Sequence, residues 1–280
     1  MIGSLGPEGS FTAFALESYI SRSKLTEQVI YFDSFRQIFN ALSENKINKV
    51  FIPLENSIGG DVFSVLEELI SLDLNYKISD EFQCLIEQSL LATKTMHFKD
   101  VDLIYSHEQS MRQSNDFIQK NCINAKFQTI DSNSKAAQLV SGFTDKNYAC
   151  IGHKKLADIY GLVVLEKNIA NEKGNKTRFV LISEENTQPS GNDKSSFIFS
   201  SHKDQPGSLV DVLLELSDRN INLTRISSFP TRKMLGDYLF FIDFLGHCED
   251  SSIKECLDVL RSKCSYFKFL GSYPKGDTNA

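Results

Sequence analysis

The sequence has no long apolar run, no strong excess of charge of one sign and no closely spaced cysteine pair. No stretch approaches the roughly 20 apolar residues that a membrane-spanning helix needs. The 30 basic and 36 acidic residues leave a formal charge of −6, which excludes the generally basic surface of a protein that binds the nucleic-acid backbone. The first residues, Met1–Pro7, lack the basic and apolar segments of a secretory signal. These absences predict a soluble, cytoplasmic protein that binds neither nucleic acid nor membranes.

The six cysteines never occur in a C-x-x-C pattern, and none of the five histidines supplies a closely spaced partner for zinc. In a cytoplasmic chain of this length, an even number of cysteines does not imply disulfides. The sequence therefore predicts free thiols and no metal site.

Length and composition predict an ordinary globular protein of about two domains. The chain has 280 residues, of which 41% are hydrophobic and 24% are charged. Up to about residue 184, short apolar runs alternate with amphipathic segments, which predicts an α/β fold with open, mostly parallel sheets. Strands are expected at 2–5, 29–32, 50–52, 90–92, 103–105, 126–129 and 149–151. Helices are expected after the capping residues Ser10, Ser34 and Asp61, and near 109–120, 133–141 and 154–160.

The polar segment Ser183–Ser195 contains Pro189 and Gly191 and is typical of a linker. Beyond it, the expected order between residues 197 and 273 is strand, helix, strand, strand, helix, strand. This βαββαβ order predicts a second, ferredoxin-like domain.

Three polar loops follow predicted strands, and ligands bind there in open α/β sheets. Gly6–Ser10 opens a helix whose N-terminus favours an anion, although a plain serine-capped turn explains the same residues. Pro53–Gly60 holds a carboxylate, an amide and a hydroxyl. A partly buried Glu55 would suit acid catalysis, and an Asx turn into the next helix is the structural alternative. Ser106–Gln109 is the third loop, and a lone histidine there is more often a solvated residue than a catalyst.

Asn175–Phe179 opens a later strand with several polar groups. Arg178 offers a planar fork that suits a carboxylate, and Thr177 offers a hydroxyl beside it. By themselves, these residues indicate a polar start to a strand and no more.

Taken together, these segments resemble the prephenate dehydratase family with a C-terminal ACT domain, over essentially the whole chain. Each motif alone is weak, but their order and spacing are specific. The matching segments are Gly6–Thr12, Pro53–Ser57, Ser106–Gln109, Asp131–Ala137, Tyr160–Leu165, Thr177–Phe179, Pro206–Leu209 and a degenerate Ser227–Pro230.

The resemblance implies an α/β catalytic region of two lobes, similar to a type II periplasmic binding protein, over residues 1–184. Lobe one would comprise about 1–75 and 162–184, and lobe two about 76–161, with the active site in the cleft between them. A βαββαβ ferredoxin-like ACT regulatory domain would follow at 196–274. The implied reaction converts prephenate to phenylpyruvate, CO2 and water in L-phenylalanine biosynthesis. Aromatisation drives it, so no metal or organic cofactor is implied.

The resemblance also implies the site residues. Thr177 is the central catalytic residue, and hydrogen-bond donation to the departing hydroxyl suits an alcohol better than formal acid catalysis. Glu55 is the second candidate for the proton source. The residues implied in substrate binding are Ser10, Phe11, Asn56, Ser57, Ser106, Gln109, Gln113, Asp131, Ser132, Arg178 and Phe179.

The implied ACT domain predicts L-phenylalanine as effector and self-association as a homodimer or tetramer. The implied effector-binding residues are Pro206, Gly207, Ser208, Leu209, Asn222, Leu223 and Thr224. Ser227 and Phe229 stand where the family has an acid and an arginine, which predicts weakened or altered inhibition. Restoring both charged residues is expected to restore sensitivity. Glu108 and His153 also depart from the family pattern.

Two other functions remain open from the sequence. Arogenate dehydratase performs the same elimination on the transaminated substrate, and the residues barely discriminate between the two. A non-catalytic amino-acid sensor is the third possibility. The intact Thr177–Phe179 and Glu55–Ser57 segments argue against it, because a sensor needs no proton-donor set.

Overall fold

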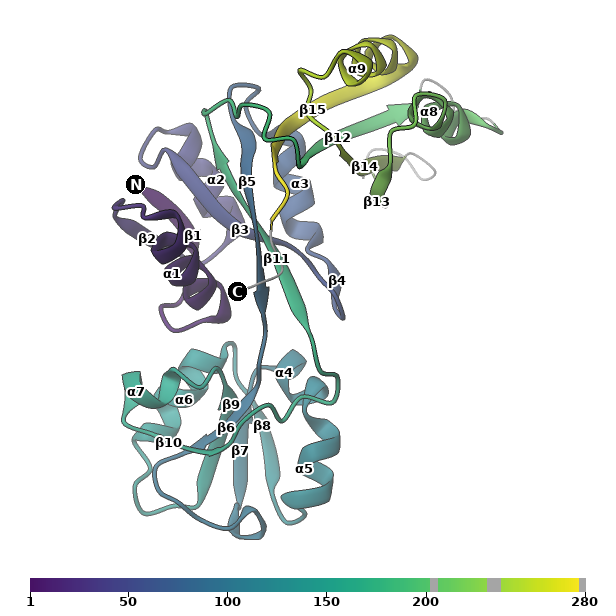
Figure 1. Cartoon of the computed structure of the whole chain (residues 1–280). Coiled ribbons are helices and arrows are strands. Elements are labelled where there is room, and N and C mark those ends of the chain that lie inside the picture. The colour runs from purple at the N-terminus through teal and green to yellow at the C-terminus, as the bar shows by residue number, and fades with distance from the viewer. Residues whose placement is uncertain (202–205, 231–237, 277–280) are drawn as a thin grey trace.

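Two mixed sheets and one antiparallel sheet organise the chain in the computed structural model, which describes residues 1–201, 206–230 and 238–276 (Figure 1). The first two sheets form the two lobes, and the third belongs to the C-terminal domain. The fold class expected from the sequence, an α/β two-lobed region followed by a ferredoxin-like domain, is confirmed.

The first lobe is built on a sheet with the strand order β2-β1-β3-β11-β5, and β4 pairs with β3. Its elements are β1 (Ile2–Leu5), α1 (Phe11–Ser23), β2 (Val29–Phe32), α2 (Phe35–Ser43), β3 (Lys49–Asn56), β4 (Gly60–Asp61), α3 (Phe63–Ser71), β5 (Lys77–Leu85) and β11 (Lys176–Ser183). β1 runs parallel to β2 and β3, whereas β11 is antiparallel to β3 and β5. α1 packs on one face of this sheet, and α2 and α3 pack on the other.

Two of the three predicted helix caps are correct. Ser10 accepts a hydrogen bond from the backbone N–H of Ala13, and Ser34 accepts one from Gln37. The cap predicted at Asp61 is wrong. Asp61 pairs with Glu55 in the short β3–β4 hairpin, and its carboxylate contacts Arg225 of the C-terminal domain. The helix that follows it has no side-chain cap.

The second lobe has the strand order β10-β6-β9-β7-β8. Its elements are β6 (Ser89–Ala92), the 3₁₀ turn η1 (Phe98–Asp100), β7 (Leu103–Ser106), α4 (Glu108–Gln113), α5 (Asn115–Asn121), β8 (Lys126–Thr129), α6 (Asn133–Ser141), β9 (Tyr148–Gly152), α7 (Leu156–Tyr160) and β10 (Val163–Glu166). The single helix predicted over 109–120 is interrupted at Ser114, which separates α4 from α5. β7 is parallel to β8 and β9, and the other two pairings are antiparallel.

The chain crosses between the lobes later than the sequence suggested. The predicted crossings lie near residues 75 and 162, but β5 belongs to the first sheet and β10 to the second. The crossings therefore follow β5 and precede β11. The mostly parallel sheets predicted from the alternation of elements are mixed. The strands β5 and β10 were not predicted, and the later strand that was predicted, β11, runs antiparallel to its neighbours. β5 has the sequence KISDEFQCL, and its charged residues, including the buried Glu81, gave this strand the pattern of a polar segment.

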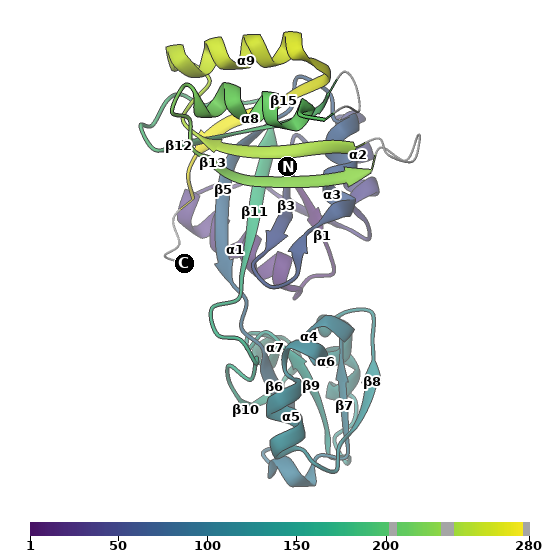
Figure 2. The same cartoon turned by 90° about the vertical axis from the view of Figure 1, so that its right-hand side faces the viewer.

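The C-terminal domain has the predicted βαββαβ order. Its elements are β12 (Asp193–Ser201), α8 (Ser208–Ser217), β13 (Leu223–Pro230), β14 (Tyr238–Leu245), α9 (Ser251–Lys263) and β15 (Cys264–Pro274). The strands pair antiparallel in the order β13-β14-β12-β15, and α8 and α9 cover one face (Figure 2). β12 begins at Asp193, so the predicted linker is shorter than Ser183–Ser195.

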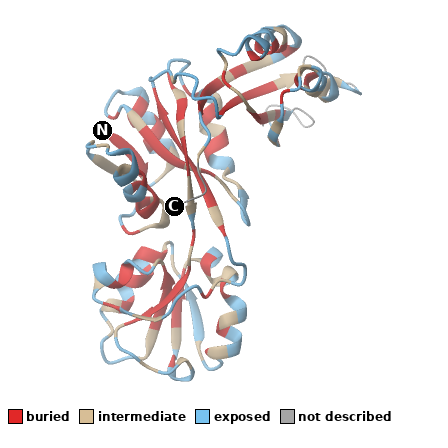
Figure 3. Cartoon of the chain, in the orientation of Figure 1, coloured by how far each residue is buried: buried red, intermediate tan, exposed pale blue. Residues whose placement is uncertain are grey.

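The other face of this third sheet shares a hydrophobic core with the first lobe (Figure 3). Phe229 is 2% exposed in that core, which also contains Val65 and Leu66 of α3. Tyr266 and Lys268 donate hydrogen bonds to the carbonyl of Ile70 at the end of the same helix region. The domain is thus docked on the first lobe through a continuous core.

This packing changes the expectation for the degenerate Ser227–Pro230 segment. An arginine at Phe229 would place a guanidinium in an apolar core, which costs free energy unless the charge is paired. Ser227 donates a hydrogen bond to the carboxylate of Asp61. A glutamate at Ser227 would set a second carboxylate against Asp61. The double substitution expected to restore sensitivity therefore does not fit this fold.

All six cysteines carry free thiols. The longest α-helices in the described ranges, α1 and α9, have 13 residues each. No helix within those ranges is long and apolar enough to cross a membrane.

Candidate active site

A cavity of about 620 Å³ lies between the two lobes. Residues at the N-termini of four helices line it, α1 and α3 from the first lobe and α4 and α6 from the second. The first lobe and the crossing segments contribute Leu5, Gly6, Ser10, Phe11, Thr12, Pro53, Asn56, residues 59–64, Ile86, Gln88, Asn175, Thr177 and Phe179. The second lobe contributes His107, Gln109, Ser110, Gln113 and residues 131–133.

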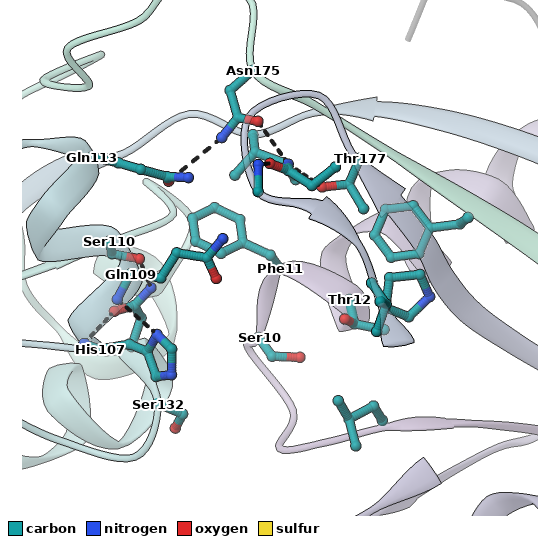
Figure 4. A pocket seen from close by; sticks show the side chains of 18 of the residues that line it. Ser10, Phe11, Thr12, His107, Gln109, Ser110, Gln113, Ser132, Asn175 and Thr177 are labelled. Carbon is teal, nitrogen blue, oxygen red and sulfur yellow. Dashed lines mark hydrogen bonds between the residues drawn. The ribbon is translucent and has the colours of Figure 1, made fainter. Parts of the chain in front are cut away.

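The hydroxyl of Thr177 accepts a hydrogen bond from Asn56 Nδ2 at 2.9 Å (Figure 4). The orientation of this amide is set by its other contacts, because Asn56 Oδ1 accepts from the backbone N–H groups of Ile58 and Gly59. Its Nδ2 also donates to Asn175 Oδ1 at 2.7 Å. An amide nitrogen is only a donor, so Thr177 Oγ1 is the acceptor here and keeps its own proton for another group.

Arg178 does not line the cavity, and its predicted role in substrate binding is corrected. Successive residues of a strand face opposite sides of a sheet, so Thr177 and Phe179 share the cavity face and Arg178 lies behind them. Its side chain is 6% exposed, and its guanidinium contacts Glu55 at 2.9 Å and Asp243 at 2.5 Å. This alternation was available from the sequence once Thr177 was assigned to a strand.

Glu55 also lies outside the cavity, which argues against its predicted role as a proton source. From Phe51 and Pro53, simple alternation along β3 would direct Glu55 toward the cavity. The pairing with β11 shows a bulge at this point, because Phe179 pairs with Pro53 but Arg178 pairs with Glu55. The extra residue, Leu54, reverses the phase of the strand, so that Asn56 faces the cavity instead.

A largely buried group of charged side chains, which we call the interface charge cluster, lies in and behind this wall of the cavity. Its members are Glu55, Asp61, Glu81, Arg178, Arg225 and Asp243. Glu81 and Asp243 have fully buried side chains, and Lys194 also pairs with Glu81 at 3.0 Å. Burial alone would raise the pKa of Asp243, but the charge and hydrogen bond of Arg178 outweigh it and hold that pKa below its ordinary value.

The second lobe arranges its cavity residues through Asn133. Asn133 Oδ1 accepts from the backbone N–H of His107 at 2.9 Å, and its Nδ2 donates to Ser110 at 2.6 Å. The side chain of His107 caps α4 by accepting from the N–H of Gln109 through Nδ1, which leaves Nε2 to carry the proton of a neutral ring. Ser106 is buried beneath them and donates to Asn133 Oδ1 at 3.4 Å.

The predicted site residues therefore divide into two sets. Those that line the cavity are Ser10, Phe11, Asn56, Gln109, Gln113, Asp131, Ser132, Thr177 and Phe179. Those outside the lining are Glu55, Ser57, Ser106 and Arg178. Ser57 instead accepts from the backbone N–H of Lys176 at 2.9 Å and so joins the hairpin to β11.

Several polar lining residues were not predicted. They are Thr12, Asp61, Ser64, Gln88, His107, Ser110, Asn133 and Asn175. The signal for His107 was its place inside the Ser106–Gln109 motif, where the sequence favoured a solvated loop residue. Gln88 had no local signal, because it lies in a crossing segment that becomes part of the cavity only when the lobes come together.

None of the described residues that line the cavity is a lysine or an arginine. Partial positive charge is supplied instead by the N-termini of α1, α3 and α6, whose first N–H groups have no backbone partner within the helix. Ser10 caps α1 and Ser132 caps α6, on opposite walls of the cavity. This arrangement suits a ligand with two separated carboxylates.

His153 joins the two lobes beside the cavity. Its ring lies 4.4 Å from the ring of Phe14 and 5.9 Å from that of Phe11, centroid to centroid. Lys155 of the second lobe also pairs with Glu17 of α1 at 3.2 Å. Burial, reinforced by the nearby Lys155 and Lys154, lowers the pKa of His153 from 6.5 to about 4.

We expect His153→Phe to flatten the pH dependence of stability between about pH 6.5 and 4. The folded protein favours the neutral ring, so the unfolded chain takes up a proton at higher pH than the folded one. The contribution of His153 is therefore complete above about pH 6.5 and lost as the pH falls toward 4. Urea unfolding across this range measures it, with His97→Phe at an exposed position as the control. Equal slopes for wild type and His153→Phe would contradict the assignment.

The segments predicted to bind the effector lie at the start of two elements of the C-terminal domain. Gly207 has a φ of +93°, which favours glycine, and stands at the N-cap position of α8. Asn222 precedes β13, and its carbonyl accepts from the N–H of Leu245.

The sequence profile of prephenate dehydratases matches residues 2–187, and that of the ACT domain matches residues 196–261. The chain belongs to the prephenate dehydratase family. The first match spans both lobes and the whole cavity, and the second begins in β12 of the docked domain.

Individual relatives agree with this membership. The prephenate dehydratase of Methanocaldococcus jannaschii is 33% identical over 274 residues, which cover 97% of both chains. A bifunctional chorismate mutase/prephenate dehydratase of Pseudomonas aeruginosa is 32% identical over 97% of this chain and 72% of its own. The crystal structure of the Arthrobacter aurescens prephenate dehydratase in complex with L-Phe superposes with a TM-score of 0.87 at 28% identity. It covers 98% of this chain and 90% of that one.

Proposed function

We propose that this protein is a prephenate dehydratase, a hydro-lyase that converts prephenate to phenylpyruvate, CO2 and water. The observation that carries the proposal is the Thr177–Asn56 pair, which presents a hydroxyl donor to a cavity between two lobes in a member of this family. A cavity of this size suits a substrate with a single six-membered ring and a short side chain.

The proposed step is a coupled elimination. The bond between the ring and its carboxylate breaks, CO2 leaves, and that electron pair enters the ring. The carbon–oxygen bond to the ring hydroxyl breaks at the same time, and one proton taken from solution makes the departing oxygen water. Thr177 donates a hydrogen bond to that oxygen as negative charge develops on it, which lowers the barrier.

The two substrate carboxylates would be held without a cationic side chain. The N-termini of α1 and α3 lie on the first-lobe wall of the cavity, and the N-terminus of α6 lies on the second-lobe wall. Gln109, Gln113 and Asn175 offer further amide donors on the cavity wall. Gln113 also ties the second lobe to the crossing segments, through Gln88 at 3.3 Å and Asn175 at 3.5 Å.

The ACT domain supports regulation by L-phenylalanine, the ligand named for the Arthrobacter relative. The proposed effector site lies at Pro206–Leu209 and Asn222–Thr224, and a homodimer or tetramer would form through this domain. The protein would act in the cytoplasm, as expected for an enzyme of amino-acid biosynthesis.

The test is turnover of purified protein with prephenate, followed as phenylpyruvate absorbance at alkaline pH, with arogenate offered in parallel. Phenylpyruvate formation from prephenate is the expected result. A large preference for arogenate would reassign the substrate. No turnover of either, with ligand binding intact, would indicate a sensor. Calorimetric titration of L-phenylalanine, alongside an inhibition assay, tests the regulatory part. No heat and no inhibition at millimolar concentration would leave the ACT domain with a dimerisation role only.

A further inference from the structure

Arg225 reaches from the ACT domain into the wall of the cavity. It lies on β13, and its side chain is 9% exposed. Its guanidinium contacts Asp61 at 2.5 Å and Glu55 at 3.1 Å, and it lies 4.5 Å from the centre of the Phe241 ring. Ser227, two residues further along the same strand, donates to the same carboxylate of Asp61. One strand of the regulatory domain therefore holds both acidic residues of the β3–β4 hairpin.

Those contacts matter because Asp61 belongs to the cavity lining. The other carboxylate in that lining, Asp131, is largely exposed to solvent and pairs with Lys135 at 3.1 Å. The described lining has no cationic side chain of its own. Without Arg225, Asp61 would stand as an uncompensated negative charge beside a ligand that carries two negative charges.

The same contact holds one end of the hairpin that carries Asn56, whose amide is fixed separately by the N–H groups of Ile58 and Gly59 and by Asn175. Asp61 pairs with Glu55 across the hairpin, and the next pair along is Gly60 with Asn56. Asn56 is the residue that donates to Thr177. Arg225 contacts only the first of these pairs, Asp61 and Glu55, and so holds the hairpin in place beside the cavity.

We propose that Arg225 of the ACT domain is a positioning residue of the dehydratase site, which neutralises Asp61 and holds the β3–β4 hairpin for binding of a dianionic substrate. This inference rests on the proposed function and adds to it a residue from outside the catalytic region. Arg225 directly follows Asn222–Thr224, so a ligand that moves this segment also moves the clamp. Substrate affinity, rather than the rate of the chemical step, is the quantity that the clamp controls.

The experiment compares steady-state kinetics of wild type, Arg225→Met and Arg225→Lys in the full-length protein. We expect Arg225→Met to raise KM for prephenate by about 10-fold or more, with kcat within about 3-fold of wild type, since the variant loses ground-state binding. Arg225→Lys keeps the positive charge but loses the planar guanidinium that contacts two carboxylates, so its KM should lie between those of wild type and Arg225→Met. Arg219→Met is the matched control, because Arg219 pairs with Glu215 on α8 of the same domain.

Replacing Asp61 itself separates the loss of charge neutralisation from a general loss of structure. In the Asp61→Asn background, the negative charge at position 61 is absent, so adding Arg225→Met should raise KM by less than about 3-fold. An equally large rise in that background, or an unchanged KM in Arg225→Met alone, overturns the inference. Wild-type turnover, measured first, reports on the proposed function separately. If wild type converts no prephenate, the dehydratase assignment fails, and this inference fails with it.

Discussion

We expect Thr177→Ala to leave the protein folded and to lower kcat for prephenate by about 100-fold or more. Thr177 is 9% exposed at the start of β11, and its hydroxyl accepts from Asn56. Asn56 Nδ2 keeps Asn175 Oδ1 and the carbonyl of Lys176 as acceptors after the change. The substitution therefore removes the proposed donor without leaving a buried polar group unpaired.

Two further variants at the same position sharpen this test. Thr177→Ser retains the hydroxyl and should keep most of the activity, whereas Thr177→Val retains the shape and should lose activity as Thr177→Ala does. Unfolding midpoints establish that all three are folded. A folded Thr177→Val protein with kcat within about 3-fold of wild type would contradict the role of the hydroxyl.

The second large effect is expected on stability. Arg178→Met should lower the free energy of unfolding by about 3–5 kcal/mol, because it removes one partner of a buried ion-pair group. Asp243 has a fully buried side chain and, among the residues that the structure describes, would keep Arg225 at 3.6 Å as its one counterion. Tyr273 would also lose the guanidinium that donates to its hydroxyl at 2.7 Å. Arg178→Lys should recover part of the loss, since one ammonium cannot span the same partners.

Denaturant unfolding of the full chain measures this prediction, with Arg112→Met as the control. Arg112 pairs with Glu108 on the surface of α4, where an ion pair contributes about 0–1 kcal/mol. If Arg178→Met is as stable as wild type and instead raises KM for prephenate, Arg178 belongs to substrate binding after all. That result would require its side chain to leave the interface charge cluster.

Several features followed from local sequence alone. Apolar periodicity predicted most of the helices and strands, and the serine caps at Ser10 and Ser34 began the helices that they were expected to begin. The βαββαβ order of the C-terminal domain was read in full, because each element has its own hydrophobic pattern and clear ends. The family motifs likewise led to the residues of the cavity wall, including Thr177 and Asn56.

The errors at Glu55 and Arg178 share one physical cause, which is that neighbouring residues of a strand face different environments. Thr177 and Arg178 are adjacent in one motif, yet one lines the cavity and the other is buried in the interface charge cluster. The alternation of a strand could have separated them. The facing of Glu55 could not be predicted in this way, because the bulge at Leu54 reverses the alternation of β3 and no local sequence pattern indicates the bulge.

The sequence by itself determined the family, the two classes of domain and part of the set of polar residues from which the cavity is built. Only the tertiary structure decided which of those residues face the cavity and which stabilise its wall. It also decided that β13 of the ACT domain brings Arg225 and Ser227 to Asp61, a contact between residues 164 and 166 positions apart. Such pairing depends on how the first lobe and the third sheet share a core, and packing across that distance leaves no local signature in the chain.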